Sequence, residues 1–155
     1  LELDGCPVTD AGLPALSKLT ALKRLSLNRT RITDDGIKHL SALKALSDLN
    51  LEQVSLSDAA IKSLPNTLTR LDLAGTRITD AGVPALAAIK GLKILYLTDT
   101  RVRDAGLKSV AELASLEELT LGGNPVTDVG VRALAKLPKL RVLGLRFTDV
   151  VGRAF

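Results

Sequence analysis

The stretch LDLAGTRITDAGVPALAAIKGLKI, residues 71–94, is the pattern on which the whole chain is built. Its opening triplet, Leu71-Asp72-Leu73, alternates apolar and polar side chains, which is typical of a short strand with one buried face. After Asp80, an apolar residue recurs at every third position: Val83, Leu86, Ile89 and Leu92. This spacing predicts a helical or 3₁₀ segment that packs on the strand. We therefore expect a unit of one strand and one short helical segment.

The same unit recurs in register along the chain. The Leu-x-Leu pair begins at seven positions, 24 residues apart except for one step of 22 residues: Leu1, Leu25, Leu49, Leu71, Leu95, Leu119 and Leu143. One such unit cannot bury its leucines alone, and stacked units share a continuous core. The periodicity therefore predicts a solenoid.

The motif from Ile78 to Gly82, ITDAG, resembles the leucine-rich repeat family, in its 24-residue subclass LxLxxTxITDxG. This subclass is related to the cysteine-containing repeats of F-box proteins, but the regular length and the recurrent Thr are more similar to bacterial repeats. The resemblance implies an α/β fold: a right-handed curved solenoid with a parallel sheet on the concave face and short helices or 3₁₀ turns on the convex face. It extends over residues 1–155 as one domain of about six and a half repeats, the last one partial.

Two recurrent positions are expected to stabilise each coil. An Asp precedes each helical segment and is predicted to cap its free backbone N–H groups: Asp10, Asp34, Asp58, Asp80, Asp104 and Asp128. A Gly follows two residues later, except that Ala60 takes this place in the third unit. Because Ala is tolerated there, we expect these glycines to permit close packing and not a positive φ. The resemblance implies that Cys6, in the slot of the recurrent Thr, points inward in a structural role.

The composition restricts the classes of function that are compatible with the chain. Apolar residues make up 46% of the chain and aromatic residues only 2%, so the core is expected to be aliphatic. The net charge of +4 is spread over all units without a basic run interleaved with aromatics, which does not favour nucleic acid as a partner. No apolar run approaches the roughly 18 residues of a membrane span. Cys6 is the single cysteine, which excludes an internal disulfide and favours a cytoplasmic location.

Nothing in the sequence indicates an enzyme. It contains no Gly-rich phosphate loop, no metal-ligand spacing and no nucleophile elbow, and His39 is the only histidine. We therefore predict no catalytic, cofactor-binding or metal-binding residues and no cofactor. His39 is expected on the solvated convex side.

The irregular coil and the two ends allow more than one interpretation. Residues 49–70 form the short unit, in which Pro65 is expected to end the helix, and the deletion either changes the curvature or fits a partner. Residue 1 opens directly on a strand, so we expect the chain to be a fragment of a longer protein. Phe147 and Phe155 are predicted to plug the end of the core, to be exposed at a truncated end, or to pack on a following domain.

The face of the sheet turned away from the core is the predicted binding surface. Alternation along each strand places the residues beside and between the two leucines on this face. The third unit is acidic there, and the fifth places Tyr96, the only tyrosine, beside Ile94. This composition is typical of an interaction hot spot, although a tyrosine also suits a strand. The candidate partner-binding residues are Asp48, Asn50, Glu52, Arg70, Asp72, Ile94, Tyr96 and Thr98.

The leading hypothesis is a monomeric module that binds a protein partner on the concave sheet. One alternative is a structural spacer within a larger protein. A second, from the resemblance to F-box repeats, is the recognition subunit of a ubiquitin-ligase-like or effector system. A third is an anion binder that uses the edge formed by Arg31, Arg77 and Arg101.

Overall fold

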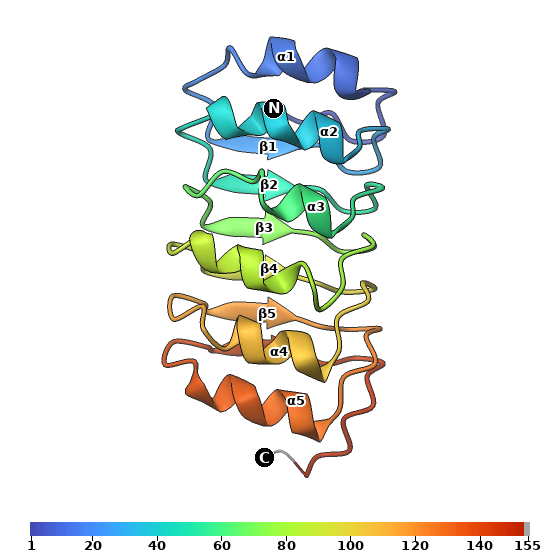
Figure 1. Cartoon of the computed structure of the whole chain (residues 1–155), viewed down its shortest axis with the longest axis vertical. Coiled ribbons are helices and arrows are strands. Elements are labelled where there is room, and N and C mark those ends of the chain that lie inside the picture. Colours follow the sequence, from blue (N-terminus) through green and yellow to red (C-terminus); the bar gives the residue numbers. More distant parts are fainter. Residues whose placement is uncertain (154–155) are drawn as a thin grey trace.

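A single parallel sheet runs the length of the molecule. The computed structural model describes residues 1–153. Its six strands pair in sequence order and all in parallel (Figure 1): β1 (Arg24–Ser26), β2 (Asp48–Asn50), β3 (Arg70–Asp72), β4 (Ile94–Tyr96), β5 (Glu118–Thr120) and β6 (Val142–Gly144). Glu2 forms an isolated parallel bridge with Ser26, which joins the first coil to the sheet. The fold is therefore the α/β solenoid expected from the repeat.

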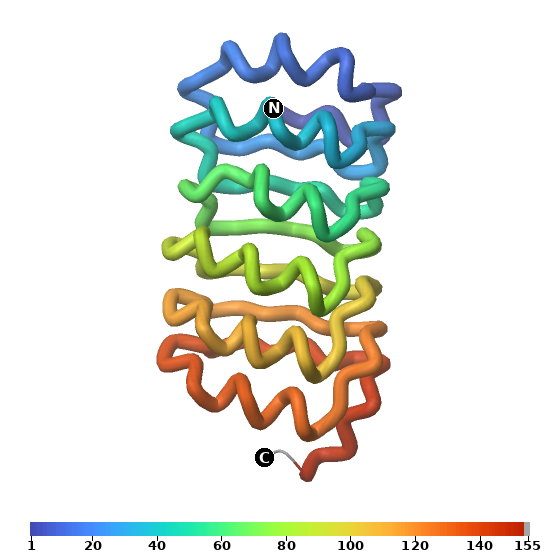
Figure 2. Tube along the Cα trace, in the orientation of Figure 1, coloured from blue at the N-terminus to red at the C-terminus, as the bar shows by residue number. Residues whose placement is uncertain are grey.

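Short helical segments form the second layer, and the chain passes from strand to helix and back in each coil (Figure 2). The α-helices are α1 (Leu13–Leu16), α2 (Asp34–Ile37), α3 (Asp58–Ile61), α4 (Asp104–Val110) and α5 (Asp128–Ala133). The 3₁₀ segments are η1 (Asp10–Gly12), η2 (Lys38–Ala42), η3 (Val83–Ala88) and η4 (Leu134–Lys136). No helix within residues 1–153 is long and apolar enough to cross a membrane.

The core lies between these two layers and consists of aliphatic side chains. The first leucines of successive units pair across the sheet, Leu25 with Leu49 and Leu49 with Leu71, and all three are at most 2% exposed. The second leucines of the five inner units, Leu27, Leu51, Leu73, Leu97 and Leu121, are fully buried, so the residue between the two leucines faces outward. Complete burial of one such side chain contributes about 1.5–3 kcal/mol.

The short third unit keeps this register. Asp48 of β2 pairs with Arg70 of β3 although only 22 residues separate them. The difference is absorbed after α3, which ends at Ile61, in a turn that reaches Pro65, a residue without the N–H needed to continue the helix. The deletion thus leaves the sheet unchanged.

The recurrent Thr slot closes the turn after β1, β3 and β4. The hydroxyls of Thr30, Thr76 and Thr100 each donate to the backbone carbonyl three residues earlier, at 2.6–2.8 Å. Asn124 in the same slot links two coils, because its amide donates to the Leu97 carbonyl at 2.6 Å. The inward position predicted for Cys6 is wrong, since its side chain is exposed. The first coil packs against another coil on one side only.

The Asp that precedes each helix has a different role from the predicted one. The N-caps of α2, α3 and α5 are Thr33, Ser57 and Thr127, whose hydroxyls accept a hydrogen bond from the backbone N–H two residues later. The Asp instead reaches the next coil. Asp34 accepts the Ser57 backbone N–H at 2.8 Å and also the Ser57 hydroxyl. The predicted capping role is therefore wrong, and the carboxylate joins neighbouring coils.

The recurrent Gly makes room for this carboxylate, as the packing prediction required. Gly82 and Gly130 have negative φ angles within their helical turns. A Cβ at Gly82 would lie 2.4 Å from Asp58 Oδ1, and a Cβ at Gly130 would lie 2.4 Å from Asp104 Oδ1. Both distances are far below van der Waals contact. The glycine and the carboxylate of the preceding coil are thus one packing unit.

We predict that Asp34→Ala lowers the free energy of unfolding by about 2 kcal/mol, because two charge-assisted hydrogen bonds to the next coil are lost. Asp35→Ala is the matched control, since the adjacent Asp35 side chain is 81% exposed and pairs only with Lys38. Its effect is expected to be much smaller, because substitutions at exposed positions without buried partners change stability little. Urea denaturation measures both, and equal losses would contradict a role of Asp34 between coils.

A second pair of variants tests the packing of the glycines. Gly130→Ala is expected to destabilise the protein by about 1–3 kcal/mol, because the new methyl meets both the Asp104 carboxylate and its Cα, at 2.8 Å. Gly12→Ala is the control, since its Cβ would meet only the Val8 methyl, at 3.7 Å. Thermal unfolding of both variants should show a loss for the first alone. A gain for Gly130→Ala would exclude the packing explanation.

Candidate functional site

The outward residues of the sheet form three columns across the coils, which we call the sheet face. The first column precedes the buried leucine: Arg24, Asp48, Arg70, Ile94, Glu118 and Val142. The second lies between the leucines: Glu2, Ser26, Asn50, Asp72, Tyr96, Thr120 and Gly144. The third lies two residues beyond: Asp4, Asn28, Glu52, Ala74, Thr98, Gly122 and Arg146.

The structure brings the eight candidate residues together on β2, β3 and β4 and on the residues that directly follow β2 and β4. Arg70 stands between Asp48 and Ile94 in the first column, and Asp72 stands between Asn50 and Tyr96 in the second. All eight side chains, including Glu52 and Thr98 in the third column, are half-buried. Their proximity follows from parallel, in-register pairing, in which neighbouring strands lie about 4.8 Å apart.

A chain of polar contacts runs diagonally through this group. Arg70 Nε lies 3.6 Å from Asp48 Oδ1, and the Arg70 guanidinium stacks over the Tyr96 ring at 4.8 Å from its centroid. The Tyr96 hydroxyl in turn donates to Glu118 Oε1 at 2.9 Å. A stacked guanidinium at a partly exposed site contributes about 0.5–1 kcal/mol. Tyr96 is thus a half-buried ring held in one orientation.

Glu118 was missing from the candidate residues. It stands in the first column on β5, the same position that Arg70 holds on β3. Its contact with Tyr96 joins residues of neighbouring strands that are 22 positions apart in the sequence. The column position was visible in the sequence, but the partner of the hydroxyl was not.

Carboxylates crowd the centre of the sheet face. Burial raises the pKa of Asp72, a hydrogen bond from the Ala74 N–H lowers it, and the neighbouring Glu52 carboxylate raises it further. Glu52 accepts a hydrogen bond from the Asn28 amide at 3.4 Å. Burial, followed by the hydrogen bond to Glu118, also raises the pKa of Tyr96. Because its pKa is raised, ionisation of Asp72 lowers the free energy of unfolding.

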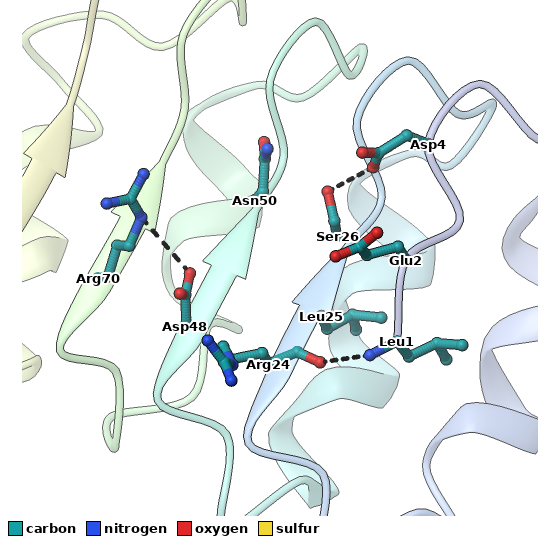
Figure 3. A pocket seen from close by; sticks show the side chains of 9 residues that line it. All are labelled: Leu1, Glu2, Asp4, Arg24, Leu25, Ser26, Asp48, Asn50 and Arg70. Carbon is teal, nitrogen blue, oxygen red and sulfur yellow. Dashed lines mark hydrogen bonds and ion pairs between the residues drawn. The ribbon is translucent and has the colours of Figure 1, made fainter.

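Two hollows lie on the sheet face. The first, of about 570 Å³, is lined mostly by charged side chains, among them Glu2, Arg24 and Asp48 (Figure 3). Within it, Asp4 accepts a hydrogen bond from the Ser26 hydroxyl. The second hollow, of about 380 Å³, lies over β5 and β6 and has a mainly apolar lining: Thr98, Asp99, Thr120, Gly122, Gly123, Gly144, Arg146 and Phe147.

Other predicted features lie away from this face. His39 is exposed beside the helical layer, as expected. Arg77 and Arg101 are exposed, and none of the ion pairs within residues 1–153 involves either of them. Of the three alternatives for Phe147, the plug of the core is wrong, because the side chain is 86% exposed; Phe155 lies outside the described residues. Within the described part of the chain, no group of His, Cys, Asp or Glu side chains is arranged to hold a metal ion.

Comparisons with known proteins agree with this architecture. One family model described as leucine rich repeat matches residues 90–150, and another with the same description matches residues 18–41 and 65–87. The crystal structure of an internalin (inlF) from Listeria monocytogenes aligns with a TM-score of 0.63 at 20% sequence identity. The alignment covers 89% of this chain and 45% of the internalin chain. No curated protein matches the sequence.

The raised pKa of Asp72 predicts how stability depends on pH. Because the folded state holds this proton more tightly than the unfolded state, stability contributed by Asp72 falls as the pH rises through the raised pKa. Asp72→Asn removes this cost and retains an oxygen for the Ala74 N–H. The variant should therefore be more stable than the wild type at pH 7, with an advantage that shrinks towards the ordinary carboxyl pKa of 3.8.

The matched control is Asp35→Asn, because Lys38 lowers the pKa of Asp35, so this carboxylate acts in the opposite direction. Urea midpoints of the wild type and the two variants, measured from about pH 3 to pH 8, make the comparison. A constant difference between Asp72→Asn and the wild type across this range would contradict the assigned role of the carboxylate.

Proposed function

The chain belongs to the leucine-rich repeat family, and we propose that it is a protein-recognition module whose partner binds the sheet face around Tyr96. The proposal assigns the binding surface to Asp48, Asn50, Glu52, Arg70, Asp72, Ile94, Tyr96 and Thr98, with Glu118 added. No catalytic step is part of it.

The observation that carries the proposal is the cluster of half-buried charges around a fixed aromatic ring. Glu52 and Asp72 face outward from neighbouring coils, and the Glu52 carboxylate helps to raise the pKa of Asp72. Groups that reduce stability on an exposed surface are common where a protein meets a ligand. A structural spacer would be served equally well by neutral side chains at these positions.

Tyr96 supports the same assignment. Its ring is positioned by Arg70 on one face and its hydroxyl by Glu118. Tyrosine and arginine are the residue types that dominate binding energy at protein interfaces, especially when their side chains are already ordered. The contacts within the chain therefore reduce the conformational entropy that Tyr96 would lose on binding.

Affinity capture from a lysate of the source organism tests the proposal with Asp72→Arg and Tyr96→Ala as variants. We expect at least one protein that binds the wild type to be lost or reduced about tenfold with either variant, since a hot-spot side chain contributes about 2 kcal/mol or more. Asp35→Arg is the matched control, because it makes the same charge change on the exposed helical side.

All variants are first compared by thermal unfolding, so that a loss of fold is not read as a loss of binding. If Asp35→Arg and Asp72→Arg reduce binding equally, the overall charge of the protein and not the sheet face would explain the loss. Capture that all variants retain would contradict the sheet face as the binding surface and favour the helical side or the arginine edge.

A further inference from the structure

Charge is unevenly divided between the sheet face and the rest of the molecule. The sheet face carries six carboxylates (Glu2, Asp4, Asp48, Glu52, Asp72 and Glu118) and three arginines (Arg24, Arg70 and Arg146), a net charge of −3. The remaining residues comprise 18 basic and 11 acidic side chains, a net charge of +7. A basic protein thus presents an acidic surface on one side of its sheet.

The acidity is concentrated on the first four coils, where five of the six carboxylates lie. Of the two arginines in this region, Arg70 is already engaged by Asp48 and by the Tyr96 ring. This half of the face therefore has an excess of acceptors, which a cationic donor from outside would satisfy.

The sheet face of the last three coils has no net charge, since Glu118 and Arg146 balance, and it contains the second hollow. Gly122 and Gly144 leave open space over β5 and β6, and the methyl groups of Thr98 and Thr120 border it. Phe147, 86% exposed, stands at the rim of this hollow. Its volume of about 380 Å³ is sufficient for a large apolar side chain.

The third column connects the two halves without an obstacle. Between Glu52 and Gly122 it contains only Ala74 and Thr98. Three strand spacings separate Glu52 from Gly122, which is about 14 Å at about 4.8 Å per strand. An extended segment covers this distance in about four residues.

We propose, on the premise that the sheet face binds a protein, that the partner presents an extended basic segment. A Lys or Arg of this segment contacts the carboxylates of Glu52 and Asp72. A large apolar side chain, four residues along the segment, enters the hollow beside Gly122 and Phe147. Charge complementarity favours the basic side chain at the carboxylates, and the shape of the hollow favours the large apolar side chain.

Selection from a phage-displayed library of random 12-residue peptides tests this inference on the whole chain. We expect the enriched peptides to carry Lys or Arg and, four residues away, an aromatic or large aliphatic residue. A synthetic copy of the most enriched peptide should bind about tenfold more weakly to the Glu52→Gln/Asp72→Asn variant, as expected when a charge-assisted contact is lost. Its affinity should also fall with salt.

Two further variants separate the contacts. Glu112→Gln/Asp35→Asn makes the same charge change at exposed positions on the helical side and should bind like the wild type. Thr120→Trp fills the hollow and should abolish the preference for the apolar residue while the preference for the basic residue remains.

The outcomes distinguish this inference from the proposed function. If the enriched peptides are neutral or acidic and their binding is lost with Tyr96→Ala, the inference of a basic segment is overturned. The sheet face would still be the binding surface. Peptides that bind all sheet-face variants equally would contradict both. The absence of any enriched peptide would overturn the basic segment, because a preformed complementary site selects ligands from such a library.

Discussion

The carboxylate that each coil sends to the next is the constraint on which the rest of the structure depends. In the fourth coil, Thr79 donates its hydroxyl hydrogen to Asp58 and accepts the N–H of Ala81, so one side chain caps its own turn and binds the preceding coil. The Asp58 carboxylate also occupies the space that a Cβ at Gly82 would need. Because this linkage recurs, the distance between coils is set on the helical side, and the strands on the other side remain at pairing distance.

Regular stacking gives the sheet face its character. Side chains of neighbouring strands come within contact distance although they lie 22 residues apart, which places Asp48 beside Arg70 within one column and Tyr96 beside Glu118 across two columns. The same regularity brings Glu52 close to Asp72, where burial and like charge raise the pKa of Asp72. A solenoid can hold such a group because the buried leucines and the linkages between coils supply stability elsewhere.

In the shortened third unit, the helical side of the coil changes and the sheet face is preserved. Its missing residues come from the turn after α3, while the strand register from Asp48 to Arg70 is preserved. The columns of the sheet face therefore continue across the irregular coil without a break. A partner segment that crosses the strands would meet the same spacing from β2 to β5, with charge at one end and an open apolar hollow at the other.

The sequence by itself determined the solenoid and the membership of the sheet face, because these depend on local alternation and on a period that each unit repeats, and the resemblance to leucine-rich repeats implied the parallel sheet. Only the tertiary structure decided what particular side chains do. An Asp before a helix is compatible with a cap or with a bridge, and only stacking shows that the N–H groups within its reach belong to the next coil. The exposure of Cys6 and Phe147 and the Tyr96–Glu118 contact were likewise decided between coils, where burial and hydrogen bonding depend on neighbours distant in sequence.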